Sequence, residues 1–146
     1  LADAGISFGV VRDVIMVVRT YPIRVGGPSG AMGQVTDFEK IQRRSQIPLE
    51  EFDTTERGTV SGRKRRVAEF DWTRIRRSAQ LNGATKIALT FADYFGIENR
   101  SATDYGSLNE QTQNFIRRLE SVTGVSVDFV SKAFAKGGVI EKGTWK

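Results

Sequence analysis

The 146-residue chain contains no cysteine and no histidine. Without cysteine it has no disulfide, no thiolate nucleophile and no zinc–thiolate site. Without histidine it lacks the commonest general acid or base and the commonest metal ligand. Any chemistry performed by this chain must therefore use carboxylates, lysines, tyrosines or backbone groups.

Long apolar runs are also missing: no stretch approaches the roughly eighteen residues that a membrane-spanning helix needs. The most apolar window, FGVVRDVIMVV, is interrupted by Arg12 and Asp13. It has no basic leader before it and no cleavage site after it, so it is not read as a signal peptide. We therefore expect no membrane partner and a cytoplasmic location. The chain starts at Leu1, as an internal piece, a processed product or a trimmed product of a longer protein would.

The composition is that of one globular domain, with 39% hydrophobic and 27% charged residues. The net charge of +5 is unevenly spread. Within 57–77, only Glu69 and Asp71 oppose a basic set: Arg57, Arg63, Lys64, Arg65, Arg66, Arg74, Arg76 and Arg77. This local excess predicts a local anionic partner rather than a generally basic protein.

Hydrophobic periodicity divides the chain into alternating strands and helices. Extended segments are expected at 19–25, 52–57, 63–70, 85–91 and 125–130. Helices are expected at 36–44, at 72–82 and between Ser107 and Gly124. Residues 8–18 fit either a buried helix or a strand. The alternation predicts an α/β fold with a mixed, partly parallel sheet and flanking helices.

Capping residues set the expected helix ends. Capping-box spacing occurs at Thr36–Glu39 and at Ser107–Glu110. Asp71 can cap the helix over 72–82, and Gly83 can end it. Pro48 is expected to stop the first helix. Residues 131–146, rich in glycine and lysine, are expected to form a loosely ordered tail.

The segment TVSGRKRR at 59–66 joins hydroxyl groups to a basic run. Thr59 and Ser61 can donate to carboxylate or phosphate oxygens, and Gly62 lets backbone amides turn toward an anion. If 63–66 is extended, Arg63 and Arg65 share one face and can make bidentate contacts. A solvated loop, a small-anion site and a nucleic-acid patch all remain open. The last is the least favoured, because no aromatic residue is interleaved for base stacking.

Two further segments allow a functional and a plain interpretation. GGPSGAMG at 26–33 lacks the lysine–hydroxyl pair of a P-loop, so it is either a surface turn or a place where backbone approaches a ligand. LTFAD at 89–93 places Asp93 directly after a buried strand. Ligands of open α/β sheets bind near the carboxyl ends of strands, so Asp93 is either a turn former or a binding residue.

Four segments, taken in order, resemble the C-terminal part of the adenylosuccinate synthetases: VRTYPIRVGGPSGAMG, TTERGTVSGRKRRVAEFDW, QLNGATKIALTFAD and FIRRLESVTGVSVDFV. The resemblance covers about residues 8–130. It implies that 1–130 form the C-terminal region of that family, within a larger P-loop-ligase-like fold. RTYPIRVGG and RRVAEFDW look closer to a divergent branch that includes phage enzymes making 2-aminoadenine nucleotides.

The resemblance implies a ligase that joins L-aspartate to a purine nucleotide. The nucleotide would be IMP, or dGMP in the phage-type branch, and GTP or ATP would be the phosphate donor. Mg²⁺ would serve the whole enzyme through ligands outside this chain. A homodimer would be the expected assembly, because family members are commonly homodimers.

The resemblance also implies residue roles. The loop that closes over aspartate would consist of Thr59, Val60, Ser61, Gly62 and Arg63. Arg63 and Arg65 would hold carboxylates and nearby phosphate oxygens, while Val25 and Gly26 would lie beside the nucleotide substrate. Asp93, with Thr90 in the same motif, would accept hydrogen bonds from the base of the donor. Phe91 replaces the lysine of the family's Thr-Lys-Leu-Asp motif, so Asp93 could accept from guanine or from adenine.

The family's phosphate loop, catalytic aspartate base and histidine acid lie toward its N-terminus, and none is present here. We therefore expect no catalytic residue and no metal ligand in this chain, and no ligation by the chain alone. It would be a fragment of a longer enzyme, one half of a split enzyme that needs an N-terminal partner, or a descendant retained for nucleotide or protein binding.

Overall fold

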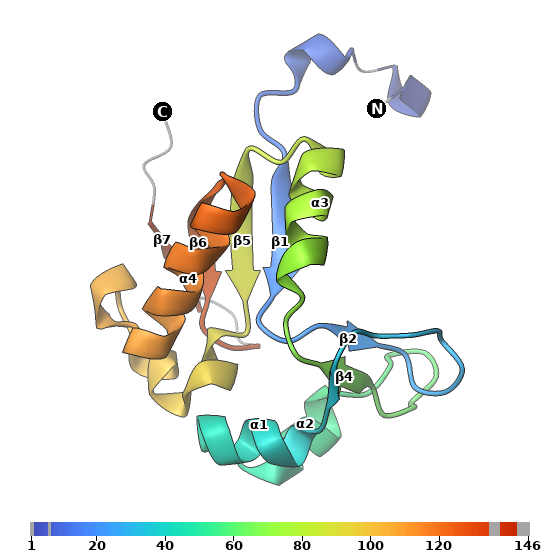
Figure 1. Cartoon of the computed structure of the whole chain (residues 1–146), viewed down its shortest axis with the longest axis vertical. Coiled ribbons are helices and arrows are strands. Elements are labelled where there is room, and N and C mark those ends of the chain that lie inside the picture. Colours follow the sequence, from blue (N-terminus) through green and yellow to red (C-terminus); the bar gives the residue numbers. More distant parts are fainter. Residues whose placement is uncertain (1, 6, 135–137, 143–146) are drawn as a thin grey trace.

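A computed structural model describes residues 2–5, 7–134 and 138–142. Its centre is a four-stranded sheet of order β1-β5-β6-β7. The strands are β1 (Ile15–Arg19), β5 (Lys86–Thr90), β6 (Ser126–Ser131) and β7 (Val139–Glu141). The first three are parallel, and β7 runs antiparallel to β6. Helices α3 (Trp72–Asn82) and α4 (Glu110–Thr123) lie side by side on one face (Figure 1). The predicted mixed, partly parallel α/β fold is confirmed.

Of the segment at 8–18, which fitted a helix or a strand, only residues 15–18 form a strand, as the start of β1. Two short 3₁₀ helices, η1 (Ala2–Ala4) and η2 (Phe8–Val10), precede β1. Val18 is buried while Val17 is exposed, because successive side chains of a strand point to opposite faces. The same alternation buries Ile87 and Leu89 of β5.

A second unit, residues 20–71, is inserted between β1 and α3. It contains β2 (Ile23–Arg24), β3 (Val35–Thr36), α1 (Phe38–Ser45), α2 (Leu49–Thr55) and β4 (Arg66–Ala68). Its strands form an antiparallel sheet of order β2-β4-β3. Figure 1 shows this unit at the end of the large sheet toward which β1 and β5 point. The insertion therefore covers the carboxyl end of the parallel strands.

Two apolar cores hold the elements together. The first lies between the large sheet and its helices, and its fully buried members include Ile87, Leu89, Ile116, Leu119, Val127 and Val130. The second lies in and beside the insertion: Tyr21, Phe38, Ile41, Ile47, Phe52, Val67, Tyr94 and Phe95. Phe115 of α4 packs against both. The insertion is thus joined to the sheet by shared apolar packing.

The extended segment predicted at 52–57 is wrong, because α2 occupies Leu49–Thr55. Phe52 is buried in a stacked contact with Phe38 and an edge contact with Tyr94. Pro48 is the N-cap residue directly before this helix, where the lack of a backbone N–H costs no helical hydrogen bond. The turn over 58–62 is present, closed by a bridge between Arg57 and Lys64.

The helix caps differ partly from expectation. Asp37, not Thr36, caps α1 by accepting from the Lys40 amide at 2.7 Å. Asn109 caps α4, whereas Ser107 belongs to the short helix η5 (Tyr105–Ser107). For α3 the prediction is confirmed: its N-cap is Asp71, and it ends at a glycine in the left-handed conformation, Gly83.

Between β5 and η5 the chain forms η3 (Ala92–Phe95) and η4 (Ile97–Ser101). Within the region expected to be a loose tail, Val139–Glu141 form strand β7, and Ile140 is buried. Residues 135–137 and 143–146 of that region lie outside the described residues. Among the helices that the structure describes, none is long and apolar enough to cross a membrane.

Candidate functional site

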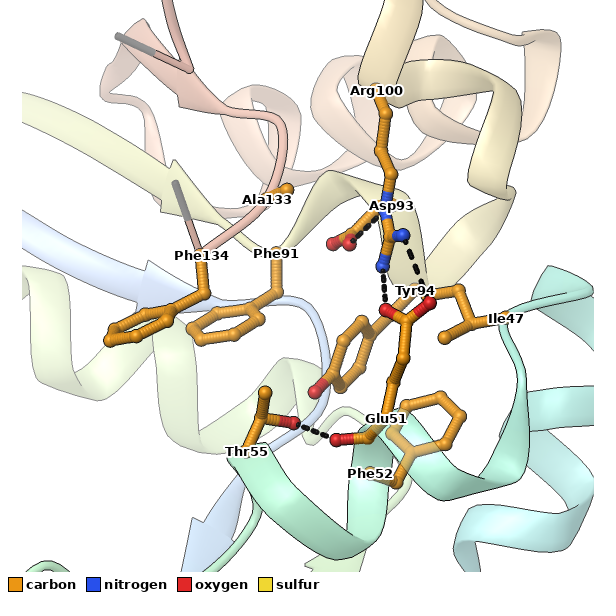
Figure 2. A pocket seen from close by; sticks show the side chains of 10 residues that line it. All are labelled: Ile47, Glu51, Phe52, Thr55, Phe91, Asp93, Tyr94, Arg100, Ala133 and Phe134. Atoms are coloured by element: carbon orange, nitrogen blue, oxygen red, sulfur yellow. Dashed lines mark hydrogen bonds and ion pairs between the residues drawn. The ribbon is translucent and has the colours of Figure 1, made fainter. Parts of the chain in front are cut away.

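The candidate site lies where the parallel strands end and the insertion begins. Arg19 ends β1, Thr90 ends β5, and Ala133 follows β6. In open α/β sheets, ligands bind in the crevice outside the carboxyl ends of such strands. Here that crevice is walled by α2 on the other side (Figure 2).

Phe91 makes the turn that carries the chain from β5 into η3. Its φ of 60° lies in the left-handed region, which is uncommon for a residue other than glycine. Two contacts hold it there: the Thr20 hydroxyl donates to the Phe91 carbonyl at 2.8 Å, and the Arg19 guanidinium lies 3.6 Å from its ring centroid. Strained residues of this kind concentrate at functional sites. The turn brings Asp93 to the wall of a cavity.

Asp93 is 2% exposed, and its two carboxylate oxygens differ in their hydrogen bonding. Its Oδ2 accepts from Arg100 Nε at 3.1 Å. Its Oδ1 is buried and has no hydrogen-bond partner among the described residues. Burial raises the pKa of Asp93 above its ordinary value of 3.8, and the Arg100 guanidinium offsets only part of that effect. The unpartnered oxygen is an acceptor available to a ligand that brings an N–H group.

Arg100 ties Asp93 to α2. Its Nη2 donates to Glu51 Oε2 at 2.7 Å, and its Nη1 lies 3.4 Å from Glu51 Oε1. These two contacts and the bond to Asp93 involve three donors of one rigid guanidinium. Figure 2 shows Arg100 between the two carboxylates. The arrangement orients Asp93 while leaving its Oδ1 unused.

The wall around Asp93 is mostly aromatic and apolar. The cavity has a volume of about 230 Å³. Its lining is Ile47, Glu51, Phe52, Thr55, Phe91, Asp93, Tyr94, Arg100, Ala133 and Phe134. Phe134 is 83% exposed, and its ring lies beside that of Phe91 in Figure 2. We call this the Asp93 cavity. Apolar and aromatic walls beside a buried acceptor suit a heteroaromatic ring with an N–H donor.

A second cavity of about 420 Å³ adjoins the first. It is lined by Thr54, Thr55, Arg57, Gly58, Thr59, Arg65, Phe91 and Phe134. We call it the loop cavity, because it touches the turn at 58–62. Thr55, Phe91 and Phe134 line both cavities, which together form one groove. The groove runs from a carboxylate at one end to arginines at the other.

Glu56 lies beneath this groove and is completely buried. Its Oε1 accepts from Arg19 Nη2 and from the Tyr94 hydroxyl. Its Oε2 lies 3.5 Å from Arg65 Nη1. Burial and the neighbouring Glu56 carboxylate raise the pKa of Tyr94 far above its ordinary value, so its hydroxyl remains a donor. A buried carboxylate is tolerable only with such partners.

The predicted aspartate loop is an exposed turn over 58–62. Gly62 has a φ of 62°, which a glycine adopts without strain. Val60 is fully exposed, and the Ser61 hydroxyl accepts from the Arg63 amide at 3.4 Å. Among the described residues the Arg63 side chain has no ion pair or hydrogen bond, whereas Arg65 is bound to Glu56. Among the residues predicted to bind aspartate, only Thr59 and Arg65 line the loop cavity.

The glycine-rich segment after β2 lies against the base of this loop. A Cβ added to Gly26 would sit 2.3 Å from the Lys64 carbonyl oxygen, so only glycine fits there. Arg66 donates to the carbonyls of Gly27 and Gly30, at 3.4 Å for Gly27. Val25 is 54% exposed. The structure thus brings Val25 and Gly26 together with the arm that carries Arg63 and Arg65.

Thr90 also lies apart from the groove, as do the predicted residues Val25, Gly26, Val60, Ser61, Gly62 and Arg63. Its hydroxyl donates to the Val18 carbonyl of the neighbouring strand at 3.2 Å. It lines neither the Asp93 cavity nor the loop cavity. No cluster of three or more metal-ligating side chains occurs within 2–5, 7–134 and 138–142.

Sequence reasoning missed Glu56, Arg100, Arg19 and Tyr94. Each is an ordinary residue in its local context, and their partners lie seven to 49 positions away in the chain. The one available signal is Glu56 itself, an acidic residue directly before a basic stretch. The sequence around Glu56 does not indicate that its side chain is buried.

Fold and cavities define an α/β protein with a candidate ligand groove at the carboxyl ends of its parallel strands. The family model for adenylosuccinate synthetase matches residues 1–100. The chain is 40% identical over 130 residues to the adenylosuccinate synthetase of Methanocaldococcus jannaschii, covering 89% of this chain and 35% of that protein. It is 38% identical over 133 residues to that of Pyrococcus horikoshii, covering 88% and 35%. The chain belongs to the adenylosuccinate synthetase family and spans about a third of the length of these relatives.

Two solved structures share the fold. Fully ligated adenylosuccinate synthetase from Plasmodium falciparum matches with a TM-score of 0.77 at 16% identity, covering 95% of this chain and 42% of that one. The succinoaminodeoxyadenylate synthetase of cyanophage S-2L, bound to dGMP and to dATP as an energy donor, matches with a TM-score of 0.66 at 23% identity. That match covers 98% of this chain and 37% of the other.

Proposed function

We propose that this chain is the C-terminal portion of a purine-nucleotide ligase that joins L-aspartate to IMP or dGMP while a nucleoside triphosphate is hydrolysed. The observation that carries the proposal is the groove. At one end it offers Asp93 Oδ1, a buried acceptor with no hydrogen-bond partner among the described residues, and at the other end Arg57 and Arg65. A nucleoside triphosphate needs this combination, because its base donates hydrogen bonds and its phosphates attract guanidinium groups.

In this proposal the donor, GTP or ATP, places its base in the Asp93 cavity between apolar walls. Asp93 accepts from the base, and the phosphates extend toward Arg65. Thr90 acts indirectly, since its hydroxyl secures the end of β5 to β1. Mg²⁺ would be held by groups outside the described residues, which contain no suitable cluster.

The exposed loop is the proposed aspartate site. Thr59 and Ser61 supply hydroxyl donors, and Gly62 allows the loop to close around Val60. Arg63, which has no partner among the described side chains, is available for a carboxylate of aspartate. Val25 and Gly26 face the purine-nucleotide substrate. The preceding part of the enzyme would complete the site, in the same chain or as a partner, and the assembled ligase would be a homodimer.

Complementation tests this function. The preceding two thirds of a relative, such as the Methanocaldococcus jannaschii synthetase, is mixed with this chain, and consumption of aspartate with IMP or with dGMP is followed. We expect activity only from the mixture. Arg63→Ala should lower the activity of the mixture about a hundredfold, because it removes a charged contact to the substrate.

The matched control is Arg76→Ala, which removes an exposed arginine of α3 and should change activity less than twofold. If the two parts associate but neither nucleotide reacts, the ligase function is wrong. If the chain binds nucleotide tightly without any partner and never supports ligation, a descendant retained for binding is the better interpretation.

A further inference from the structure

We propose that Glu56 is a positioning residue that couples the two ends of the groove. This inference rests on the proposed donor site. Glu56 touches no ligand in it and acts through its three partners, Arg19, Arg65 and Tyr94. The first and last of these support the Asp93 cavity, whereas Arg65 lines the loop cavity.

The contact with Arg65 is the adjustable part of the network. Arg65 Nη1 lies 3.5 Å from Glu56 Oε2, at the long end of the hydrogen-bond range. The Arg65 side chain is 26% exposed, while that of Glu56 is 1% exposed. Arg65 can therefore keep one donor on the buried carboxylate and turn its remaining donors toward a ligand phosphate.

The contacts with Arg19 and Tyr94 are the fixed part. The Arg19 guanidinium is held between the Glu56 carboxylate and the Phe91 ring, 3.6 Å from the ring centroid. The rings of Tyr94 and Phe91 form an edge contact with 5.1 Å between their centroids, and the Tyr94 hydroxyl donates to Glu56. A base that packs against Phe91 thus contacts a ring that packs on Arg19 and Tyr94, and both of these side chains bind the carboxylate that also binds Arg65.

The backbone of Glu56 joins the same elements. Its carbonyl accepts from the Arg65 amide at 2.9 Å, and its amide donates to the Phe52 carbonyl at the end of α2. Side chain and backbone together fix the start of the loop arm relative to the Asp93 cavity. Glu56 consequently determines how much a bound base strengthens the binding of phosphates at Arg65.

The test compares a nucleoside with its triphosphate. The affinities of adenosine and ATP, and of guanosine and GTP, are measured by ligand-observed NMR on the full chain with Glu56→Gln. We expect the triphosphate affinity to fall about tenfold and the nucleoside affinity to change less than twofold, because Arg65 loses its anchor while the base pocket persists. Hydrogen exchange at the Gly58, Gly62 and Arg65 amides should slow with ATP or GTP in the wild type, but not in Glu56→Gln.

Tyr94→Phe is the second variant, since it removes only the hydroxyl that binds Glu56 and keeps the ring. It should lower triphosphate affinity two- to threefold in the same direction, and it decides the question if Glu56→Gln does not fold. Glu39→Gln, on the exposed side of α1, is the control and should change nothing.

Equal losses of nucleoside and triphosphate affinity would overturn the inference, because they would mark Glu56 as a purely structural residue. Unchanged affinities in both variants would overturn it as well and would leave the donor site standing. If the wild type bound no nucleoside and no triphosphate, the donor site itself would fail, and the coupling with it.

Discussion

At the residue scale, Asp93 occupies the proposed base-binding position, and its burial carries an energetic cost. Its burial raises its pKa, so the folded protein disfavours the ionised carboxylate. A group whose pKa is raised on folding stabilises the protein below its unfolded pKa, and this stabilisation is lost as the pH rises through the folded pKa. At neutral pH the charged Asp93 therefore lowers the free energy of unfolding relative to its protonated form.

Asp93→Asn should therefore unfold at an equal or higher temperature than the wild type at pH 7. The difference should shrink as the pH falls through the raised pKa toward 3.8, where the wild-type carboxyl becomes neutral. The same variant should bind GTP and ATP about tenfold more weakly, because it loses the charged acceptor. Thermal unfolding followed by circular dichroism from pH 4 to pH 8 checks the first part.

Asp104 provides a control, because its pKa is shifted in the opposite direction to that of Asp93. The Ser107 amide and the Thr103 hydroxyl hold the pKa of this exposed carboxylate below its ordinary value. Its stabilisation is present above pH 3.8 and is lost as the pH falls, so Asp104→Asn should be the less stable protein at pH 7. A markedly lower unfolding temperature of Asp93→Asn at pH 7 would contradict the reasoning.

At the element scale, the important contact joins the glycine-rich segment after β2 to the arm between the loop and β4. Gly26 is pressed against the Lys64 carbonyl, and Arg66 spans back to Gly27 and Gly30. These contacts hold together two segments that lie about 40 residues apart in the chain. Their separation determines where Arg63 and Arg65 are held.

Gly26→Ala should force these segments apart. A Cβ placed 2.3 Å from a backbone oxygen cannot be accommodated without a shift, and we expect a loss of about 1–3 kcal/mol in the free energy of unfolding. Gly9→Ala is the control, because its added Cβ would meet only the Ser7 hydroxyl at 3.6 Å. Urea unfolding measures the free energy of unfolding of both variants. Equal stability of the two variants would mean that the contact at Gly26 is looser than the structure shows.

At the scale of the whole molecule, β1 is an edge strand of the large sheet and carries exposed apolar side chains. Within the described residues β1 pairs only with β5. Val17 is 70% exposed and Ile15 is 40% exposed, on the strand that leaves its outer edge unpaired. Unpaired edges with exposed β-branched residues promote association between chains.

Val17→Lys should therefore reduce concentration-dependent association of the isolated chain without lowering its unfolding temperature. Sedimentation velocity at several concentrations measures the association. Val127→Lys is the matched opposite case: Val127 is completely buried, and a charge there should unfold the protein. If Val17→Lys sedimented like the wild type, the β1 edge would not be the associating surface.

The sequence by itself determined the local features. Hydrophobic patterning predicted strands at 85–91 and 125–130, the Asp71 cap and Gly83 predicted α3, and four segments in sequence order predicted the family. These signals are local because propensity, capping and periodicity act over a few residues. The missed helix α2 shows the limit, since Phe52 is buried by partners from α1 and η3.

Only the tertiary structure decided the environment of the charged groups. Arg100 binds one oxygen of Asp93, and the other oxygen has no hydrogen-bond partner in the part of the chain that the structure describes. Glu56 is buried in contact with Arg19, Arg65 and Tyr94. Local sequence cannot specify these contacts, because burial and ion pairing depend on segments that meet only after the chain has folded. The basic loop at 59–66 was noted from its residues, whereas the contacts of Glu56 that connect it to the wall of the Asp93 cavity were visible only in three dimensions.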